Sequence, residues 1–366
     1  MESPQDIPAV QELVRAQSRI RVRGGGSKSA LAAEANVSLA GLSGMVQYDA
    51  SEFTFTALAG TPVREVAEQL ARHGQYLPFE PPLADDGATL GGTVAAGLSG
   101  SARYRYGGVR DFLLGVRLVD GRGELVRGGG NVVKNVAGFD LPKLMVGSLG
   151  RFGVVVELSF KVFPAPERTS TILAEFGHLD TAMAAVDRMA TSPFDLMCLD
   201  VEPPNRLWIR IGGIGDALHA RLARLTSLLE MSDARIGMFA DDAEIWQDVS
   251  QFRWARENAN LVKIPLVPSE VPRLEARIAR WNGEVTRRYG VGGTVAYLAW
   301  SEPTVREGLE STLAAAHRSS LALWGDWPDP RLGPSTDNAM SDRLAAALDP
   351  QGKFAIAAAV AAPPGS

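Results

Sequence analysis

The sequence predicts an α+β protein built from two main domains. Its length of 366 residues favours about two domains. Strands and glycine-rich loops predominate over residues 19–162, whereas strands alternate with helical patterns from residue 169 to about residue 327. The change falls at residues 163–167, a proline-containing stretch that we interpret as a linker.

The overall composition is that of an ordinary globular protein. Apolar residues make up 46% of the chain, which is enough for sizeable cores, and the net charge of −5 argues against nucleic acid as a partner. No apolar run reaches the ~20 residues that span a bilayer. The first ten residues carry Glu2 and Asp6 and no apolar core, so we expect no signal peptide.

Several segments of the first half have the apolar patterns of strands. They are residues 19–23, residues 53–59, a hairpin of residues 114–119 and 124–127, and residues 154–162. We expect a helix after the second strand, in which Thr61 is the cap, Pro62 takes the first position and Gly74 ends the helix.

The second half shows a strand at residues 207–211 and a helix at residues 218–231, and no internal repeat is visible. A last helix is expected at about residues 337–348, before a tail at residues 361–366 that we expect to be disordered. Cys198 is the only cysteine, so the chain forms no internal disulfide and cannot hold an iron–sulfur cluster alone. We interpret Cys198 as a buried small apolar residue.

Glycines concentrate in loops at residues 88–97, 133–141 and 147–153. A glycine has no Cβ, so its N–H can come close to a ligand and its φ can be positive. Three such loops spaced by strands predict one extended ligand rather than three unrelated turns. A further loop, residues 24–29, follows a strand and is a candidate anion cradle, in which Ser27 and Lys28 would add a hydroxyl and a charge.

Neither common phosphate motif explains this last loop. The dinucleotide fingerprint requires glycine at its sixth position, where this chain has Ser29. The P-loop requires Gly-Lys-Ser or Gly-Lys-Thr, whereas here Ser27 precedes Lys28. Taken alone, the loop fits a tight turn and a phosphate site alike.

The order of motifs between residues 20 and 164 resembles that of a known family. The series is Arg-x-Gly-Gly-Gly-Ser, Ala-Gly-Thr, Leu-Pro-Phe-Glu-Pro, Thr-Leu-Gly-Gly-Thr-Val-Ala, Arg-Tyr-Gly, Val-Arg-Asp, Gly-Gly-x-Val-Val-Lys-Asn-Val-Ala-Gly-Phe-Asp-Leu and Gly-Ser-Leu-Gly-x-Phe-Gly-Val. Each motif is weak alone, but the series resembles flavoproteins with a PCMH-type FAD-binding domain, the vanillyl-alcohol oxidase superfamily. With Asp-Pro-Gln-Gly at residues 349–352, the run at residues 134–141 looks most like the second FAD-binding subunits of bacterial glycolate oxidases (glycolate dehydrogenases).

This resemblance implies a fold and a cofactor. Residues 1–165 would form a PCMH-type FAD-binding domain of two α+β subdomains, with FAD between them. Residues 166–335 would form an α+β cap domain with a mixed or antiparallel sheet, serving substrate binding or an interface. Residues 336–366 would form a C-terminal helix and tail that return toward the FAD-binding domain.

The resemblance also implies which residues hold FAD. The glycine loop after the first strand would bind the pyrophosphate through backbone donors, and residues 89–93 would approach the phosphates and the ribityl chain. Tyr106 and Gly107 would lie near the flavin, and Val154 and Val155 near the adenosine or the ring edge. The full predicted set is Arg23, Gly24, Gly25, Gly26, Ser27, Lys28, Pro81, Thr89, Gly91, Gly92, Thr93, Tyr106, Gly107, Gly150, Val154 and Val155.

The chain departs from the relatives in three ways. Some of them attach FAD through a histidine in the first glycine loop, but this loop has none, so we expect non-covalent FAD. Related catalytic subunits carry closely spaced histidines, but no two of the four here lie within two residues of each other, so no metal site and no catalytic residue is assigned. The family's closing Phe-Asn-Pro-Gly-Arg is replaced by Phe-Ala-Ile-Ala-Ala at residues 354–358, which bears on substrate chemistry more than on FAD binding.

Two pairs of side chains in the second half have alternative interpretations. Arg253 and Arg256 could hold a carboxylate, but their spacing favours a solvated helix face. Trp324 and Trp327 are expected in a core or an interface, with lining of the flavin cavity as the alternative.

By resemblance, the function is that of an FAD-dependent oxidoreductase acting on CH–OH groups, within a complex that oxidises glycolate to glyoxylate. Its expected partners are a paralogous FAD-binding catalytic subunit and an Fe–S subunit that passes electrons toward quinone, and the substrate is a small 2-hydroxy acid. The expected location is cytoplasmic, with any contact to the inner membrane made through partners. Two alternatives stay open: a self-sufficient FAD oxidoreductase on another hydroxyl substrate, and a structural subunit with a vestigial flavin pocket.

Overall fold

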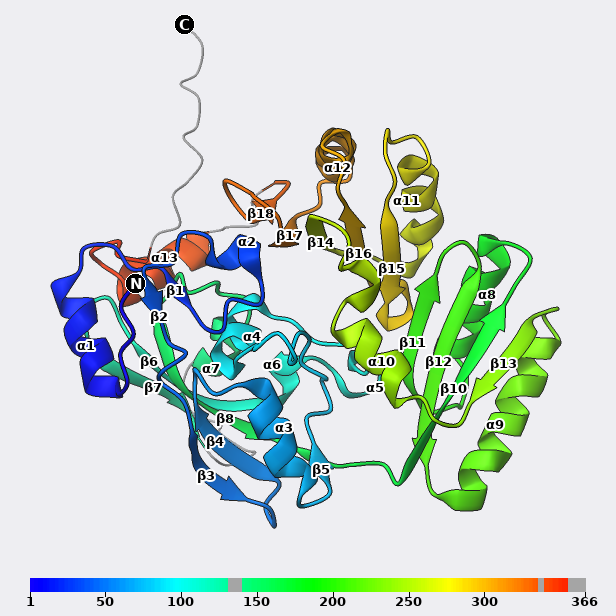
Figure 1. Ribbon diagram of the computed structural model, residues 1–366, viewed down its shortest axis with the longest axis horizontal. Helices are drawn as coiled ribbons and strands as arrows, with labels where there is room; N and C mark the ends of the chain where they lie inside the picture. Colours follow the sequence, from blue (N-terminus) through cyan, green and yellow to red (C-terminus); the bar gives the residue numbers. More distant parts are fainter. Residues whose placement is uncertain (131–139, 335–338, 355–366) are drawn as a thin grey trace, which may run out of the picture.

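The computed structural model describes residues 1–130, 140–334 and 339–354. Figure 1 shows two lobes, the first half of the chain on the left and the strands of the second half on the right. The C-terminal helix α13 (Ala339–Leu348) lies with the first lobe, where the N–H of Gly121 donates to the carbonyl of Leu348 at 2.7 Å. The predicted α+β class is confirmed.

A five-stranded antiparallel sheet forms the centre of the first lobe in the described ranges, in the order β3-β4-β8-β6-β7. Its central strand β8 is almost entirely buried because its apolar run contacts side chains on both faces. The β6–β7 hairpin turns at Asp120, whose carboxylate accepts the N–H groups of Arg122 and Glu124 at 2.9 Å. The strands are β3 (Met45–Asp49), β4 (Thr54–Leu58), β6 (Leu113–Val119), β7 (Leu125–Gly129) and β8 (Val154–Lys161).

Short elements surround this sheet and position the loops between its strands. Among them, β5 pairs with β9, so the stretch interpreted as a linker adds a short strand to the first lobe. They are α1 (Ile7–Ala16), α2 (Ser29–Ala32), α3 (Val63–Ala71), α4 (Leu90–Ala96), α5 (Arg103–Tyr106), α6 (Val109–Phe112), α7 (Leu141–Met145), β5 (Gln75–Tyr76) and β9 (Phe163–Pro164).

Two local predictions in this lobe are wrong. The strand expected at residues 19–23 is only β1 (Val22–Arg23), which pairs in parallel with β2 (Val37–Ser38). Thr61 does not cap α3, because the helix begins at Val63 with Pro62 at the cap position. The Thr61 hydroxyl instead donates to the carbonyl of Leu58 at 2.7 Å, which closes the turn after β4.

The second lobe is one sheet, nine-stranded in the described ranges, in which every neighbouring pair is antiparallel. It contains two βαββαβ units, although the sequence shows no repeat. The first unit is β10 (Arg168–Glu175), α8 (Leu179–Ala190), β11 (Leu196–Glu202), β12 (Arg206–Gly213), α9 (Gly215–Glu230) and β13 (Arg235–Phe239). The second is β14 (Asn260–Pro265), α11 (Val271–Ile278), β15 (Thr286–Gly290), β16 (Val295–Trp300), α12 (Thr304–Ala315) and β17 (Ser320–Trp324).

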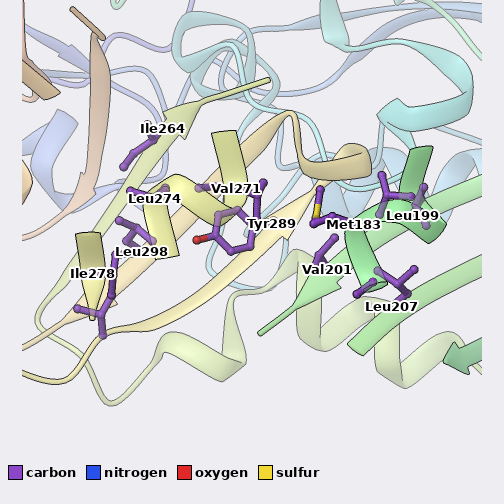
Figure 2. Close-up of a cluster of buried hydrophobic side chains, with 14 of the residues drawn as sticks. Met183, Leu199, Val201, Leu207, Ile264, Val271, Leu274, Ile278, Tyr289 and Leu298 are labelled. Atoms are coloured by element: carbon purple, nitrogen blue, oxygen red, sulfur yellow. The ribbon is translucent and has the colours of Figure 1, made fainter. Parts of the chain in front are cut away.

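Both units have the strand order of ferredoxin-like folds, with the first and third strands in the middle. They join where β11 pairs with β15, at Val201 and Tyr289. Figure 2 shows that a single apolar core continues across this joint, from Leu199 and Leu207 to Leu274 and other side chains of the second unit. Helix α10 (Ala243–Ser250) connects the units, and β18 (Arg331–Leu332) follows β17.

The sheet of the second unit is buried on both faces. Along β16, Ala296 and Leu298 contact the helices of their own lobe, whereas Val295 and Tyr297 belong to the core of the first lobe. An unbroken apolar run from Val295 to Trp300 fits this position between two layers. The second lobe therefore packs directly on the first and helps to enclose whatever lies between them.

Candidate functional site

A deep cleft crosses the first lobe and is closed on one side by the second. It runs between the loop after β1, the first turns of α4, the loop at residues 148–150 and the beginning of β8. Trp327, Pro328 and Pro330 of the second lobe and Phe354 near the C-terminus complete its walls. The cleft with its open mouth encloses about 1390 Å³, solvent at the mouth included, and its walls come from segments of both lobes. A groove with walls of this extent suits an extended ligand.

The glycine loop presents a row of unsatisfied backbone donors to this cleft. The N–H groups of Gly24, Gly25, Gly26 and Ser27 have no hydrogen-bond acceptor in the described part of the chain. Successive N–H groups without partners form a concave site for an anion. The loop therefore has the donors that a phosphate or diphosphate requires.

The glycines are needed here because one loop packs against another. A Cβ on Gly24 would lie 2.1 Å from the hydroxyl oxygen of Thr89, and one on Gly25 would lie 1.8 Å from the carbonyl oxygen of Gly87. Gly26 has a φ of +79°, a conformation that other residues rarely adopt. Close contact between the loops thus explains these glycines, and it leaves their N–H groups facing the cleft.

Buried side-chain donors add to this row. The Nε and Nη2 atoms of Arg21 and the Nε atom of Arg23 are buried without a hydrogen bond in the described ranges, although Arg21 forms an ion pair with Glu34 at 3.6 Å. The Thr93 hydroxyl is buried without a hydrogen bond as well, but Thr93 does not line the cleft. Unpaired buried polar groups are costly, so such a cluster indicates a missing partner. Guanidinium groups suit phosphate oxygens through their fork of N–H donors.

Lys28 contributes a buried positive charge. It is 7% exposed, and its ammonium donates to the Ser27 hydroxyl at 3.0 Å. Burial lowers the pKa of Lys28 to about 8, and the negative charge of Asp86 opposes this shift. An anion in the cleft would stabilise the charged form of Lys28.

Helix α4 begins at the cleft, but its first backbone N–H groups already donate hydrogen bonds within the protein. Thr89 caps the helix by accepting the N–H of Gly92 at 3.2 Å. The N–H of Gly91 donates to the carbonyl of Ala59 at 2.8 Å. Gly91 and Gly92 therefore shape the wall and bring the backbone close, while the free donors come from the glycine loop.

The second lobe fixes the glycine loop. The indole N–H of Trp324 donates to the carbonyl of Ser27 at 3.2 Å, and the guanidinium of Arg256 lies 5.2 Å from the centre of the Trp324 ring. Arg256 also forms an ion pair with Asp86. Trp324 thus has an interface role, and Trp327 is buried in the core of the second lobe and also lines the cleft. Arg256 and Arg253 pair with carboxylates of the first lobe.

Most of the residues predicted to hold FAD meet at the cleft, and a few do not. Pro81, Thr93, Tyr106 and Gly107 are not among the lining residues; Tyr106 packs edge-on against Tyr76 and Phe163. Residues 131–139, which contain most of the glycine-rich motif at 133–141, lie outside the described residues. The residues in the lining are Arg23, Gly24, Gly25, Gly26, Ser27, Lys28, Thr89, Gly91, Gly92, Gly150, Val154 and Val155.

Sequence reasoning missed several lining residues. The sequence did indicate Arg21, because alternation along the expected strand places it on the same face as Arg23. Nothing in the sequence indicated Pro328, Pro330 and Phe354, since only the packing of the second lobe and of the C-terminal segment brings them to the cleft. The lining contains no histidine and no cysteine, and Cys198 is fully buried in β11, as predicted.

A second polar region joins the lobes away from the cleft. Glu80 accepts the N–H of Ala102 at 3.1 Å and pairs with Arg210 of the second lobe at 3.2 Å. Arg210 also pairs with the buried Asp242 at 3.0 Å. Burial raises the pKa of Glu80 despite the nearby Arg210. This cluster fixes the orientation of the two lobes and so the width of the cleft.

Two other kinds of functional feature are absent from the described ranges. In the described ranges, no three His, Cys, Asp or Glu side chains gather where they could hold a metal ion. No helix within those ranges combines the length and apolar character that a membrane crossing requires.

Residues 1–129 match a family model described as an FAD binding domain. Glycolate oxidase subunit GlcE of Escherichia coli (strain K12) is 44% identical over 179 residues, which cover 49% of this chain and 51% of that protein. D-lactate dehydrogenase of Anaerostipes hadrus is 29% identical over 50% of this chain and 40% of its own length. Glycolate oxidase subunit GlcD of Bacillus subtilis (strain 168) is 32% identical over 39% of this chain and 30% of its own length. The chain thus matches about half the length of these relatives or less.

Solved structures show the same fold over nearly the whole chain. A structure of alkyldihydroxyacetonephosphate synthase matches with a TM-score of 0.72, covering 96% of this chain and 75% of its own. Because the two sequences are only 15% identical, this match shows a shared fold of the two lobes and nothing about function.

Proposed function

We propose that this chain, in which residues 1–129 match an FAD binding domain, is the FAD-binding subunit of a complex that oxidises glycolate to glyoxylate. The observation that carries the proposal is the row of free N–H groups in a cleft of the first lobe, beside two half-buried arginines that have buried guanidinium nitrogens without a hydrogen bond. The similarity to GlcE supports the reaction and the substrate class, a small 2-hydroxy acid.

The residues of the cleft fit a dinucleotide diphosphate. The amides at residues 24–27 and the guanidinium groups of Arg21 and Arg23 would bind the two phosphates, and Lys28 would add a charge. Val154, Val155 and the prolines of the second lobe offer apolar surface for the rest of the cofactor. Bound in this cleft, FAD would supply hydride-accepting chemistry for the CH–OH carbon of a 2-hydroxy acid.

The flavin is held without a covalent bond in this proposal. Family members that attach FAD need a nucleophilic side chain, and the lining described here has neither histidine nor cysteine. Acid precipitation should therefore release all the flavin into the supernatant, whereas flavin that stays with the precipitated chain would contradict this point.

The proposed complex includes a paralogous FAD-binding catalytic subunit and an Fe–S subunit that passes electrons toward quinone. The names of the GlcE and GlcD relatives support a multi-subunit enzyme. A single cysteine, buried in β11, fits a chain that leaves the cluster to a partner. The complex would be cytoplasmic and would reach the inner membrane through its partners.

The test combines cofactor binding with turnover by the complex. The chain alone should bind FAD stoichiometrically by absorbance, and Arg21→Met with Arg23→Met should weaken binding at least tenfold because each variant removes charged hydrogen bonds of ~1.5–3 kcal/mol. In the reconstituted complex, the same variants should lower glycolate-dependent reduction of an artificial acceptor. Arg224→Met, on the exposed side of α9, is the matched control and should change neither.

Two outcomes would contradict the proposal. Turnover by the isolated chain at the rate of the complex would favour a self-sufficient oxidoreductase on its own hydroxyl substrate. Full activity of a complex that has lost the flavin of this subunit alone would favour a structural subunit with a vestigial pocket.

A further inference from the structure

A second, smaller cavity lies between the lobes. Its walls come mainly from the segment after α4, the end of α10, the turn η1 (Arg253–Ala255) and the strands β15 and β16. Figure 1 shows α10 where the two lobes meet. The cavity encloses about 370 Å³, solvent at the mouth included, so it suits a small molecule. Ala96 lines the cleft and Ser99 lines the cavity, and three residues of chain span at most ~11 Å, so the two spaces are neighbours.

Three polar side chains in the wall of this cavity lack a hydrogen bond. In the described ranges, the Nη2 atom of Arg288 and the indole nitrogen of Trp254 are buried without one, and the hydroxyl of Tyr297 forms none either. Arg288 is only 8% exposed. Buried polar groups are almost always paired, so three such groups around one cavity indicate a missing partner.

The open groups of these side chains are hydrogen-bond donors. A guanidinium and an indole can only donate, and a tyrosine hydroxyl donates readily. Asp200, the carboxylate in the same wall, is already engaged, because it accepts the hydroxyl of Ser101 at 2.6 Å and the Nε–H of Arg288 at 3.2 Å. A ligand of this cavity must therefore bring acceptor oxygens, and a carboxylate brings two that suit a guanidinium.

A charged residue beside these donors also favours an anion. Arg288 lies directly opposite Tyr297 on β16, and Tyr297 lies opposite Lys263 on β14, so the three side chains share one face of the sheet. Two carboxylates, at 3.2 and 3.7 Å, balance the charge of Arg288. Lys263 donates to a backbone carbonyl at 3.2 Å and has no carboxylate partner in the part of the chain that the structure describes. Burial and the charge of Arg103 lower the pKa of Lys263 to about 8, and a bound anion would oppose this shift.

We propose that this cavity binds the carboxylate of a small acid, held by the free donors of Arg288, Trp254 and Tyr297 beside the charge of Lys263. No histidine lines the cavity in the described ranges, so the side-chain donors carry the recognition without a metal ion. The recognition of a carboxylate does not depend on the proposed reaction. That the acid is glycolate or its product glyoxylate rests on the proposed function.

Calorimetric titration of the FAD-loaded chain tests this site. Acetate should bind with a dissociation constant in the millimolar range or below, and acetamide, which has the same shape without the charge, should bind at least tenfold more weakly. Glycolate and glyoxylate are titrated in the same way, and the one that binds more tightly is the acid for which the site is built.

Variants that each remove one donor locate the acid in the cavity. Trp254→Phe and Tyr297→Phe keep the ring, and each should raise the dissociation constant for acetate about tenfold, the effect of one hydrogen bond to a charged acceptor. Arg288→Lys keeps a cation beside the carboxylate of β11 but loses the guanidinium fork, so it should raise the constant at least as much. Trp281→Phe and Tyr48→Phe remove the same atoms away from the cavity and should leave it unchanged.

Two results would overturn the proposal. Acetate that binds no more tightly than acetamide would show that the cavity holds only water, and affinities that none of the three cavity variants changes would place the acid elsewhere. Either result leaves the proposed function intact if the complex still oxidises glycolate. Acid binding by a chain whose complex does not oxidise glycolate would support this site and contradict the proposed function alone.

Unchanged flavin absorbance in each variant shows that the chain remains folded and loaded with FAD.

Discussion

Replacing Lys28 by methionine should stabilise the protein without FAD and weaken its affinity for FAD. Burial lowers the pKa of Lys28 to about 8 from its ordinary value of 10.5. A difference of about 2.5 pKa units corresponds to about 3 kcal/mol by which the folded state disfavours the charged ammonium at neutral pH. Methionine fills a similar volume and removes that cost. In a lobe of this size, the melting temperature of the apo protein should rise by about 6 °C.

The same substitution removes a cation from the cleft, so the dissociation constant for FAD should rise about ten- to a hundredfold, the value of a charged hydrogen bond. The assays are differential scanning fluorimetry on the apo chain and titration of FAD by fluorescence quenching. Lys143→Met is the matched control, because Lys143 is 42% exposed in its side chain and lies on α7 away from the lining. The control should change neither quantity measurably.

The pH dependence has a definite sign. The folded pKa of Lys28 is lowered, so between pH 8 and about 10.5 the unfolded chain binds more protons than the folded one, and stability rises with pH in that window. Lys263 acts in the same direction, since burial lowers its pKa to about 8. The Lys28→Met chain should therefore show a smaller rise than the wild type. An apo protein that is destabilised by the substitution, with unchanged affinity for FAD, would refute this reasoning.

Three further variants test the packing around the cleft. Gly25→Ala should weaken FAD binding about tenfold or more, because the new Cβ would lie 1.8 Å from a carbonyl oxygen and overpacking costs ~1–3 kcal/mol. Gly177→Ala is the control, because a Cβ at Gly177 would have no heavy atom within 4 Å, and it should bind FAD normally in the same titration. Arg210→Met should lower the free energy of unfolding in urea by about 3 kcal/mol, since the buried Asp242 and the half-buried Glu80 lose their cation. The exposed Arg206→Met on the same strand should lower it by less than about 1 kcal/mol, and equal effects would exclude a special role for the Arg210 cluster. Trp324→Phe should weaken FAD binding about threefold to tenfold by freeing the loop carbonyl at Ser27, and an unchanged dissociation constant would show that the second lobe does not order the loop.

The candidate site could be predicted from the sequence as far as the resemblance of its motif series reaches. That resemblance places the loop at residues 24–28 and the segment at residues 89–93 in one site, and the loop meets Thr89, Gly91 and Gly92 in one cleft. The reason given for the glycines was incomplete, because Gly24 and Gly25 are needed for contact between two loops. A contact of that kind depends on which loops become neighbours, which no local pattern encodes.

The second lobe was predictable in class and strand content but not in symmetry. Individual strands such as residues 207–211 were visible as apolar alternation. The two βαββαβ units were not, because they share the positions of their apolar residues and their topology rather than residue identity. The joint at Val201 and Tyr289 and the contact between Trp324 and the glycine loop are tertiary, so the sequence offered no local signal for either.

The cofactor site is also the part of the first lobe that opposes folding when FAD is absent. A buried ammonium and buried guanidinium nitrogens without a hydrogen bond each cost stability when no anion is bound. An anion that pairs with all of them recovers that cost, so binding and stability are linked, and the apo chain should gain stability steeply with FAD concentration. The donors are held in place before the ligand arrives, by loop packing at Gly24 and Gly25 and by Trp324 from the second lobe. The conformational entropy lost in ordering these donors is therefore lost when the chain folds and not when the ligand binds. The same features that weaken the protein without FAD thus favour tight binding of the diphosphate.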